Sequence, residues 1–467
     1  MQDILIKNGL IVTADDTIKA DLLISSGKIK QLGDSLDCPG SKVIDAAGKY
    51  VMPGGIDAHT HLNLQIGDHK VSDGFYEGSA AAAFGGTTCI VEHPSFGPEN
   101  CSLMHQVDEF KRAGSENSVV DFGLHGVFQH VNPETLRECA TLMDEGISSA
   151  KIYMTYSGRL QDSQILSVLE RAKEVGLLTT YHAENHDIID FLSNRLSSDN
   201  LKDPYSHSLT RPGCSEAEAI YRLISMADAL GGVPIYIVHL STAAGLSAIE
   251  AARARGLEVY AEVCPQHLLL TDFCYKEPDN KGLKYIMAPP PRKKEDVQAL
   301  WQGLVDGTID VVATDHCSFN FSEKLALGKD DFRRAPGGIP GVETRLPLLF
   351  SEGVLQNKIS LNRFVEVVST APAKLMGLFP QKGNLSLGAD GDVIVFDPNL
   401  EKTITPNILR QNADYSPFEG KTVRGWSTTT IIRGQLVVHE NQLVVEKGWG
   451  QFVNRKQAVR KSTVRGD

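Results

Sequence analysis

Six side chains that can bind metal ions stand at the ends of short apolar runs that lie far apart along the chain. They are His59, His61, Lys151, His182, His239 and Asp315. Imidazole and carboxylate groups are the usual ligands of zinc and similar divalent cations. If one fold brings these residues together, they can hold two cations that activate water for hydrolysis. The set therefore predicts a two-metal hydrolase.

The apolar runs that carry these side chains are predicted to be eight β-strands. They cover residues 51–58, 87–92, 118–124, 149–154, 177–182, 234–239, 257–263 and 309–314. Runs that are apolar throughout are typical of strands buried on both faces. Eight units alternating with helices predict a TIM-like (β/α)8 barrel, whose functional groups gather at the C-terminal ends of its strands. An open doubly wound sheet is the alternative, but no glycine-rich phosphate loop follows the first strand.

Helical patterns separate these strands, whereas both ends of the chain have a β pattern. The clearest helices are predicted at 73–84, 162–175, 216–230, 244–255 and 294–306. We predict a small β-sandwich domain built from residues 1–50 and 380–445, because neither end can form a full core alone. The metal-dependent barrel would occupy 51–379. Residues 446–467 would form a C-terminal tail that is solvated or packed against a neighbouring subunit.

Composition excludes some partners. The net charge of −12 and the pI of about 5.6 argue against a nucleic-acid or anionic membrane surface. No apolar run approaches the roughly 20 residues of a membrane helix, and we predict no secretory leader. The eight cysteines have no C-x-x-C spacing. They are therefore predicted to be reduced thiols, in a cytoplasmic protein.

Each of these candidate ligands, four histidines and one aspartate, has a simpler explanation when it is considered alone. His59 and His61 are two residues apart, so an extended strand points both to one side, although such pairs also arise by chance. His182 and His239 could be hydrogen-bonded core or surface residues. Asp315 could cap the segment that follows it. Their shared placement at the ends of strands one, five, six and eight is what favours a metal site.

Lys151 ends the fourth predicted strand. A lysine inside a barrel must be paired or neutral, so an ion-paired or snorkelling side chain is the alternative reading. Burial lowers the pKa of a lysine and leaves a neutral, nucleophilic amine. Addition of carbon dioxide to that amine would give a carbamate, which is anionic and has two oxygens. Such a group can bridge two cations.

The chain resembles the hydantoinase and dihydropyrimidinase family of the amidohydrolase superfamily over essentially its whole length, and the bacterial members above all. The resemblance rests on short segments in a fixed order. They are PGGIDAHTH at 53–61, YHAEN at 181–185, IVHLS at 237–241, EVCPQ at 262–266, ATDHC at 313–317 and NADYSP at 412–417.

The resemblance implies two divalent metal ions, with zinc as the expected metal and manganese or cobalt as alternatives. It assigns His59, His61 and Asp315 to the more buried ion, His182 and His239 to the second ion, and carboxylated Lys151 to both as a bridge. It also implies a homotetramer.

The resemblance further implies a reaction in which water opens a cyclic amide or imide to an N-carbamoyl amino acid. A hydroxide between the metals would attack the ring carbonyl. Asp315 would act as the general acid and base that moves its proton to the leaving nitrogen. Tyr156 would donate a hydrogen bond to the oxyanion.

Two implied substrate-binding positions depart from the family pattern. Ala288 stands where the family often has serine, and Gly337 stands where it often has asparagine. In the family these contacts use mainly the backbone, so imide binding is expected to survive. Gly337 would loosen its loop. Substrate affinity is the property that these changes affect.

The ring itself is only partly specified. Dihydroorotase-type relatives usually carry an arginine where this chain has Asn63, which argues against a carboxylated ring. Allantoinase and dihydropyrimidinase remain alternatives. A group at ring carbon five would meet a largely apolar pocket, unless these loop residues only pack together. The residues are Leu62, Leu64, Ile66, Phe96, Met154 and Leu160. We therefore predict a preference for 5-substituted hydantoins over dihydrouracil.

Two rivals share the expected fold. A non-catalytic, dihydropyrimidinase-like scaffold protein would lack the metal ligands. A mononuclear deaminase would generally lack the bridging lysine, so Lys151 favours two metals.

Overall fold

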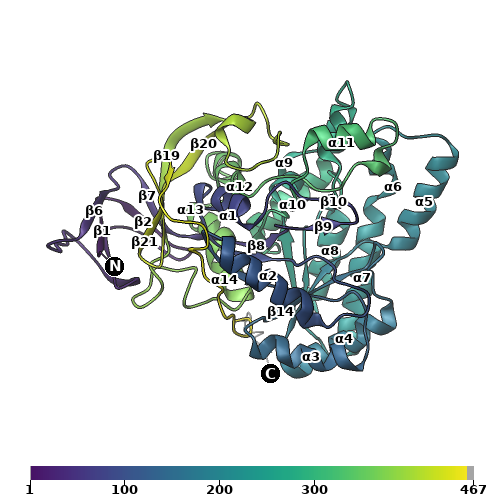
Figure 1. The fold of residues 1–467 in the computed structure, drawn as a ribbon, viewed down its shortest axis with the longest axis horizontal. Coiled ribbons are helices and arrows are strands. Elements are labelled where there is room, and N and C mark those ends of the chain that lie inside the picture. Colours follow the sequence, from purple (N-terminus) through teal and green to yellow (C-terminus); the bar gives the residue numbers. More distant parts are fainter. Residues whose placement is uncertain (1, 460–467) are drawn as a thin grey trace.

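Parallel strands alternate with helices through the middle of the chain in the computed structural model, which describes residues 2–459 (Figure 1). Each of the eight predicted runs contains at least one strand, and every neighbouring pair is parallel, so the predicted alternation is confirmed. The strands are β8 (Gly55–Thr60), β11 (Thr87–Glu92), β12 (Asp121–Leu124), β13 (Gly126–Val127), β14 (Ser149–Tyr153), β15 (Leu178–His182), β16 (Ile235–Ile237), β17 (Val259–Val263) and β18 (Val311–Val312).

These strands form two sheets that meet at both of their edges. The sheet orders are β12-β11-β8 and β13-β14-β15-β16-β17-β18. Only His125 separates β12 from β13. At the other edge, Thr60 forms a parallel bridge with His316, and the His61 amide donates to the His316 carbonyl at 2.9 Å. The C-terminal ends of the first and last strands therefore lie side by side.

Helices connect the strands, and their ends follow local sequence signals. Helices α4 (Asp162–Val175) and α10 (Lys294–Asp306) have the predicted bounds. Each ends at a glycine with positive φ, 79° at Gly176 and 88° at Gly307, which is a common way to terminate a helix. Helices α1 (Phe75–Phe84), α7 (Gly213–Ala229) and α8 (Ala243–Ala254) lie within three residues of their predicted ends.

The two ends of the chain build two further sheets, with strand orders β5-β4-β1-β6 and β22-β21-β20-β19-β7-β2-β3. Both sheets contribute to one hydrophobic cluster, which includes Ile6, Ile24, Val51, Val393 and Ile431. The strands are β1 (Ile4–Lys7), β2 (Leu10–Val12), β3 (Thr17–Lys19), β4 (Asp21–Ser25), β5 (Lys28–Gly33), β6 (Lys42–Asp45), β7 (Tyr50–Pro53), β19 (Val393–Thr403), β20 (Thr422–Ile432), β21 (Gln435–His439) and β22 (Gln442–Leu443).

The prediction of one strand over 51–58 is wrong. The run divides into β7, which pairs with β19 and β2, and β8, which pairs with β11. The break falls at Gly54, where a β-carbon would lie 2.1 Å from Thr88 Oγ1. Only glycine permits this close passage between the two sheets.

The prediction of a solvated tail is wrong for its middle part. The Phe122 amide donates to the Gln451 carbonyl at 2.9 Å, and the Val453 amide donates to the Phe122 carbonyl at 2.8 Å. Arg455 is 3% exposed and donates to the carbonyls of Met376 and Leu124. Lys456 is exposed, and three further basic positions of the predicted tail, Arg460, Lys461 and Arg465, lie outside the described residues. Between residues 2 and 459, no helix has both the length and the apolar character to cross a membrane.

Arg345 connects the first and last parallel strands from the side opposite the His61–His316 contact. It begins helix α12 (Arg345–Leu349) and is 0% exposed. Its Nη1 donates to the carbonyls of Ile56 in β8, at 2.7 Å, and Val312 in β18, at 2.9 Å. Its Nη2 donates to Thr87 Oγ1 at 3.0 Å. One guanidinium thus spans the line where the two sheets meet.

We expect Arg345→Met to lower the free energy of unfolding by roughly 3 kcal/mol, because it leaves buried acceptors unpaired and removes the cation near buried Asp57. Urea denaturation of the variant and the wild type measures this change. Arg334→Met is the matched control, since Arg334 is exposed. A loss no larger than that of the control would contradict the role assigned to Arg345.

Candidate metal centre

The C-terminal ends of β8 and β18 bring three of the candidate ligands into contact. Asp315 Oδ1 lies 3.0 Å from His59 Nε2 and 3.1 Å from His61 Nε2. The two histidine Nε2 atoms are 3.2 Å apart. The Asp315 amide also donates to the His59 carbonyl at 2.9 Å, which fixes the two segments against each other. Three ligand atoms therefore face one point.

The second pair of histidines lies beside this group. His182, the last residue of β15, and His239, two residues beyond β16, approach with 3.0 Å between His182 Nδ1 and His239 Nε2. The ring centres of His59 and His239 are 5.5 Å apart. The two groups of ligand atoms are thus neighbours in one buried site.

Buried glutamates decide which nitrogen of two histidines carries a proton. His59 Nδ1 is 2.7 Å from Glu262 Oε1, and His182 Nε2 is 2.7 Å from Glu184 Oε2. Each histidine donates this N–H to its carboxylate, which leaves the lone pair of the other nitrogen facing the site. In His59 that lone pair faces the Asp315 carboxylate. Positive charge between the two groups, from a metal ion or from a second proton on the ring, would satisfy both, so the donor set fits a metal ion.

The charges in the site agree with this reading. Burial disfavours a charged His59 ring, but the carboxylates of Asp315 and Glu262 outweigh this effect and raise its pKa. Burial likewise acts against ionised Asp315, but His59 and His61 hold the pKa of its carboxyl well below the usual range. Asp315 thus stays ionised, as a metal ligand must be.

Lys151 is 1% exposed near the end of β14, and its Nζ makes no hydrogen bond with any residue of the described chain. The Nζ lies 5.2 Å from the ring centre of Tyr153. Burial lowers the pKa of Lys151 to about 8, although Asp315 and Glu262 favour its charged form. An appreciable fraction of the amine is therefore neutral near pH 7 and able to react.

Three of the predicted site residues have left-handed backbone conformations. The φ angles are 38° at His239, 54° at Asp315 and 71° at Tyr156. Non-glycine residues adopt this region at an energetic cost, and such strain is concentrated at functional sites. Tyr156 is 37% exposed, and its ring centre lies 5.1 Å from that of His182. The Arg211 guanidinium lies 5.3 Å from the centre of the Tyr156 ring and donates to Glu184 at 2.5 Å.

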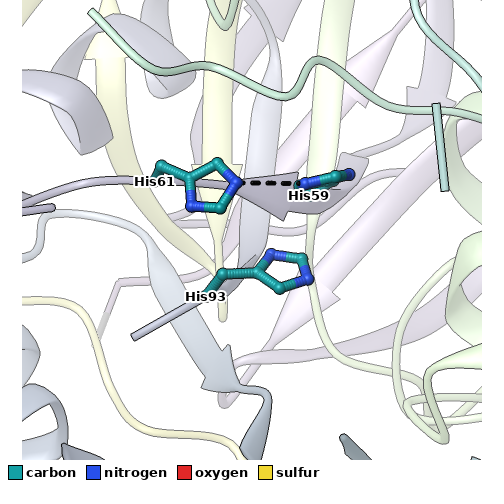
Figure 2. Close-up of side chains that lie close together, drawn as sticks. All are labelled: His59, His61 and His93. Carbon is teal, nitrogen blue, oxygen red and sulfur yellow. Dashed lines mark hydrogen bonds between the residues drawn. The ribbon is translucent and has the colours of Figure 1, made fainter. Parts of the chain in front are cut away.

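Sequence reasoning missed His93, which stands directly after β11. Its ring lies 4.3 Å from that of His59 and 5.1 Å from that of His61 (Figure 2). One nitrogen from each of these three histidines can lie within 4.8 Å of the others. Both His93 nitrogens are buried without a hydrogen-bond partner in the described chain, and its other face stacks on His125 at 4.0 Å. Its place after a parallel strand was the signal that could have identified it.

Sequence reasoning also missed Tyr153, which occupies the same side of β14 as Lys151, two residues along. Its ring centre lies 5.4 Å from that of Phe96, 6.1 Å from that of Tyr156 and 6.0 Å from that of His182. Alternation along the strand was the signal here. These rings form an aromatic wall beside the histidines.

In the structure, the residues of the predicted substituent pocket lie in different environments. Leu62, Met154 and Leu160 are buried in the main hydrophobic core, where Leu62 packs against Gly78 of α1. Leu62 is therefore not available to a substrate in this structure. Leu64 packs against a cluster that contains Cys317, while Ile66 and Phe96 are exposed.

Ala288 and Gly337, the two positions that depart from the family pattern, are each more exposed than their neighbours in the chain. Ala288 is partly exposed between buried Met287 and Pro289, and Gly337 is exposed between buried Pro336 and Gly338. No atom lies within 4 Å of the place that a β-carbon on Gly337 would occupy. The missing asparagine side chain thus leaves open space rather than a changed packing.

Comparison with known proteins agrees with this geometry. The model of the amidohydrolase family matches residues 50–437. The chain is 45% identical to D-phenylhydantoinase of Escherichia coli O1:K1 / APEC over 98% of this chain and 99% of that one. The structure matches dihydropyrimidinase from Brevibacillus agri NCHU1002 with a TM-score of 0.96 at 40% identity, covering 98% of this chain and 100% of that one.

A third match is L-hydantoinase (dihydropyrimidinase) from Arthrobacter aurescens, with a TM-score of 0.90 at 32% identity, covering 97% of this chain and 100% of that one. The chain belongs to the amidohydrolase family, a family of metal-dependent enzymes. Its relatives are hydantoinases and dihydropyrimidinases, so the resemblance seen in the sequence is confirmed.

The two glutamate–histidine pairs lead to a prediction about metal content. Glu262→Gln and Glu184→Gln should each lower metal affinity by about 10- to 100-fold, because each loosens one histidine and reduces its basicity. Elemental analysis after dialysis against graded chelator measures the loss. Glu250→Gln on the exposed face of α8 is the control. Unchanged metal retention in both variants would contradict the assigned roles.

Proposed function

We propose that this protein is a two-metal cyclic amidohydrolase that opens 5-substituted hydantoins to N-carbamoyl amino acids. The observation that carries the proposal is the convergence of His59, His61 and Asp315 on one point, with His182 and His239 beside them. The hydantoinase and dihydropyrimidinase names of its relatives support the choice of ring.

In this proposal the two groups of candidate ligands would each hold one ion, and Lys151 as a carbamate would be their shared anionic ligand. The lowered pKa of Lys151 supports the reaction of its amine with carbon dioxide, since the neutral amine is the reactive form. Zinc is the proposed metal, because the ligands are imidazoles and carboxylates. When bound, the ions would lower the pKa of water between them and polarise the ring carbonyl.

Asp315 and Tyr156 would carry out the proton transfer and the charge stabilisation. Ionised Asp315 accepts the proton of the attacking water and passes it to the departing ring nitrogen. Tyr156 keeps its phenol protonated and donates a hydrogen bond to the developing oxyanion. The Arg211 side chain, over the Tyr156 ring and bonded to Glu184, would keep that tyrosine close to His182.

The substituent at ring carbon five would lie against the aromatic wall. Phe96, Tyr153 and the exposed Ile66 are the apolar side chains that could contact it. The D-phenylhydantoinase relatives lead us to propose a D preference. The L-hydantoinase match has the same fold, so side chains at the site, and not the fold itself, would set such a preference.

Several finer features belong to the same proposal. We propose that the two parallel sheets form one closed barrel across His125 and the Thr60–His316 bridge, and that the terminal sheets form a β-sandwich. A homotetramer and a cytoplasmic location stay predictions from the family resemblance. No observation on this chain favours allantoinase, a deaminase or a scaffold protein as a second function.

Lys151→Ala should remove the bridge between the ions and nearly all ring-opening activity. We expect the turnover rate to fall by at least about a thousandfold, because both ions lose a shared anionic ligand. Steady-state assays and elemental analysis on the same preparation measure turnover and bound metal. A variant with two metals and full turnover would refute the bridging role.

The choice of ring is tested by comparing rates on dihydrouracil, both enantiomers of 5-phenylhydantoin, allantoin and dihydroorotate with metal-loaded enzyme. We expect 5-phenylhydantoin to have the highest kcat/KM, because its ring substituent can contact the aromatic wall. Equal or faster turnover of dihydrouracil would overturn the hydantoinase assignment. Opening of none of these rings, with metal bound, would overturn the proposed function.

A further inference from the structure

A buried lysine connects the two segments that carry the accessible positions Ala288 and Gly337. Lys324, on helix α11 (Phe321–Gly328), is 0% exposed. Its Nζ donates to the Ile286 carbonyl at 2.8 Å and to the Gly338 carbonyl at 2.6 Å. Among the described residues it forms no salt bridge with a carboxylate. A buried lysine without a counter-ion is costly, so its two carbonyl contacts require an explanation.

The same two segments also touch each other directly. The Gly338 amide donates to the Ile286 carbonyl at 3.0 Å, so this carbonyl accepts two hydrogen bonds. On its other side, Ile339 forms a bridge with His316, and its carbonyl accepts from the Cys317 amide at 3.0 Å. The segment around Gly337 therefore runs beside Asp315 and its neighbours.

Two histidines hold the carbonyls on either side of Ala288. His207 Nε2 donates to the Met287 carbonyl at 2.7 Å, and His267 Nε2 donates to the Pro289 carbonyl at 3.0 Å. Lys324 donates to the Ile286 carbonyl, so three buried side chains in all donate hydrogen bonds to the carbonyls of residues near Ala288. Within residues 2–459 the backbone of Ala288 itself makes no hydrogen bond, so its carbonyl stays free to accept one.

We propose that Lys324 is a positioning residue that fixes the distance between the two segments, so that the backbones at Ala288 and Gly337 meet the cyclic imide together. This inference rests on the proposed function, because it assigns the two free backbone positions to the ring. The chain lacks both side chains that its family often has there, so backbone placement carries a larger share of ring binding.

The bonds made by Lys324 do not depend on its charge. Burial lowers the pKa of Lys324 to about 7, with Cys317 and Glu323 opposing this shift, and the Tyr415 ring lies 5.9 Å away. A neutral amine still has two N–H groups, one for each carbonyl. The connection between the segments therefore persists on both sides of neutrality.

The test compares Lys324→Met with wild type on 5-phenylhydantoin, with metal content measured for each. We expect KM to rise about tenfold while kcat stays within about twofold, because the lost hydrogen bonds position the ring in the ground state and transition state alike. Lys329→Met is the matched control, since Lys329 follows the same helix and is exposed. A KM equal to that of the control would overturn the proposal.

Hydrogen–deuterium exchange tests the role of Lys324 without a measurement of activity. In Lys324→Met we expect faster exchange in both 284–289 and 336–341, with α4 and α10 unchanged. Unchanged exchange in either segment would overturn the proposal. Should the methionine variant fail to fold, Lys324→Gln, whose side chain is one atom too short to hold both carbonyls at their present distances, is judged by the same two outcomes. Wild-type enzyme that opens no cyclic ureide would refute the proposed function, whereas the exchange result would still decide whether Lys324 holds the segments.

Discussion

The hydrogen bonds that orient buried histidine rings are the constraint on which the candidate site depends. His59 donates its Nδ1 hydrogen to Glu262, so its Nε2 points at the Asp315 carboxylate, 3.0 Å away. His182 donates in the same way to Glu184, opposite His239. A cation between the partners would satisfy both contacts, as a proton on one of the rings also can. The hydrogen bonds behind the rings therefore aim the candidate ligand nitrogens at one place.

The scaffold holds these groups by fixing the strand ends on which they stand. The His61 amide and the Thr60–His316 bridge hold the first and last strands together at the metal-binding end. Arg345 does so at the opposite side through carbonyls of both strands. His59 and Asp315 are separated by more than half of the chain, yet their distance is set by these few contacts. A small error in strand register here would separate the ligand atoms.

The sequence was most informative where local signals and fold rules agree. The placement of the candidate ligands at strand ends could be predicted because parallel strands gather their C-terminal ends, and the bounds of α4 and α10 could be predicted because glycines end them. His93 was missed because it is a single histidine after a strand, with no second candidate ligand beside it in the sequence. Leu62 directly follows a candidate ligand, but the direction of its side chain, which packs against α1 in the structure, could not be read from spacing. Arg455 was assigned to solvent because nothing in a basic tail shows that this side chain will donate to the carbonyls of Met376 and Leu124.

The division of the 51–58 run has a consequence for the order in which the molecule can form. Strand β7 leads across Gly54 into the strand that ends at His59, and its antiparallel neighbour is β19, from Val393 onward. During synthesis, the start of the ligand-bearing strand therefore cannot gain this neighbour until most of the polypeptide has left the ribosome. The pairing of β7 with β19 is therefore among the last contacts that the growing chain can make, and a chain that stops before Val393 would leave β7 without this neighbour.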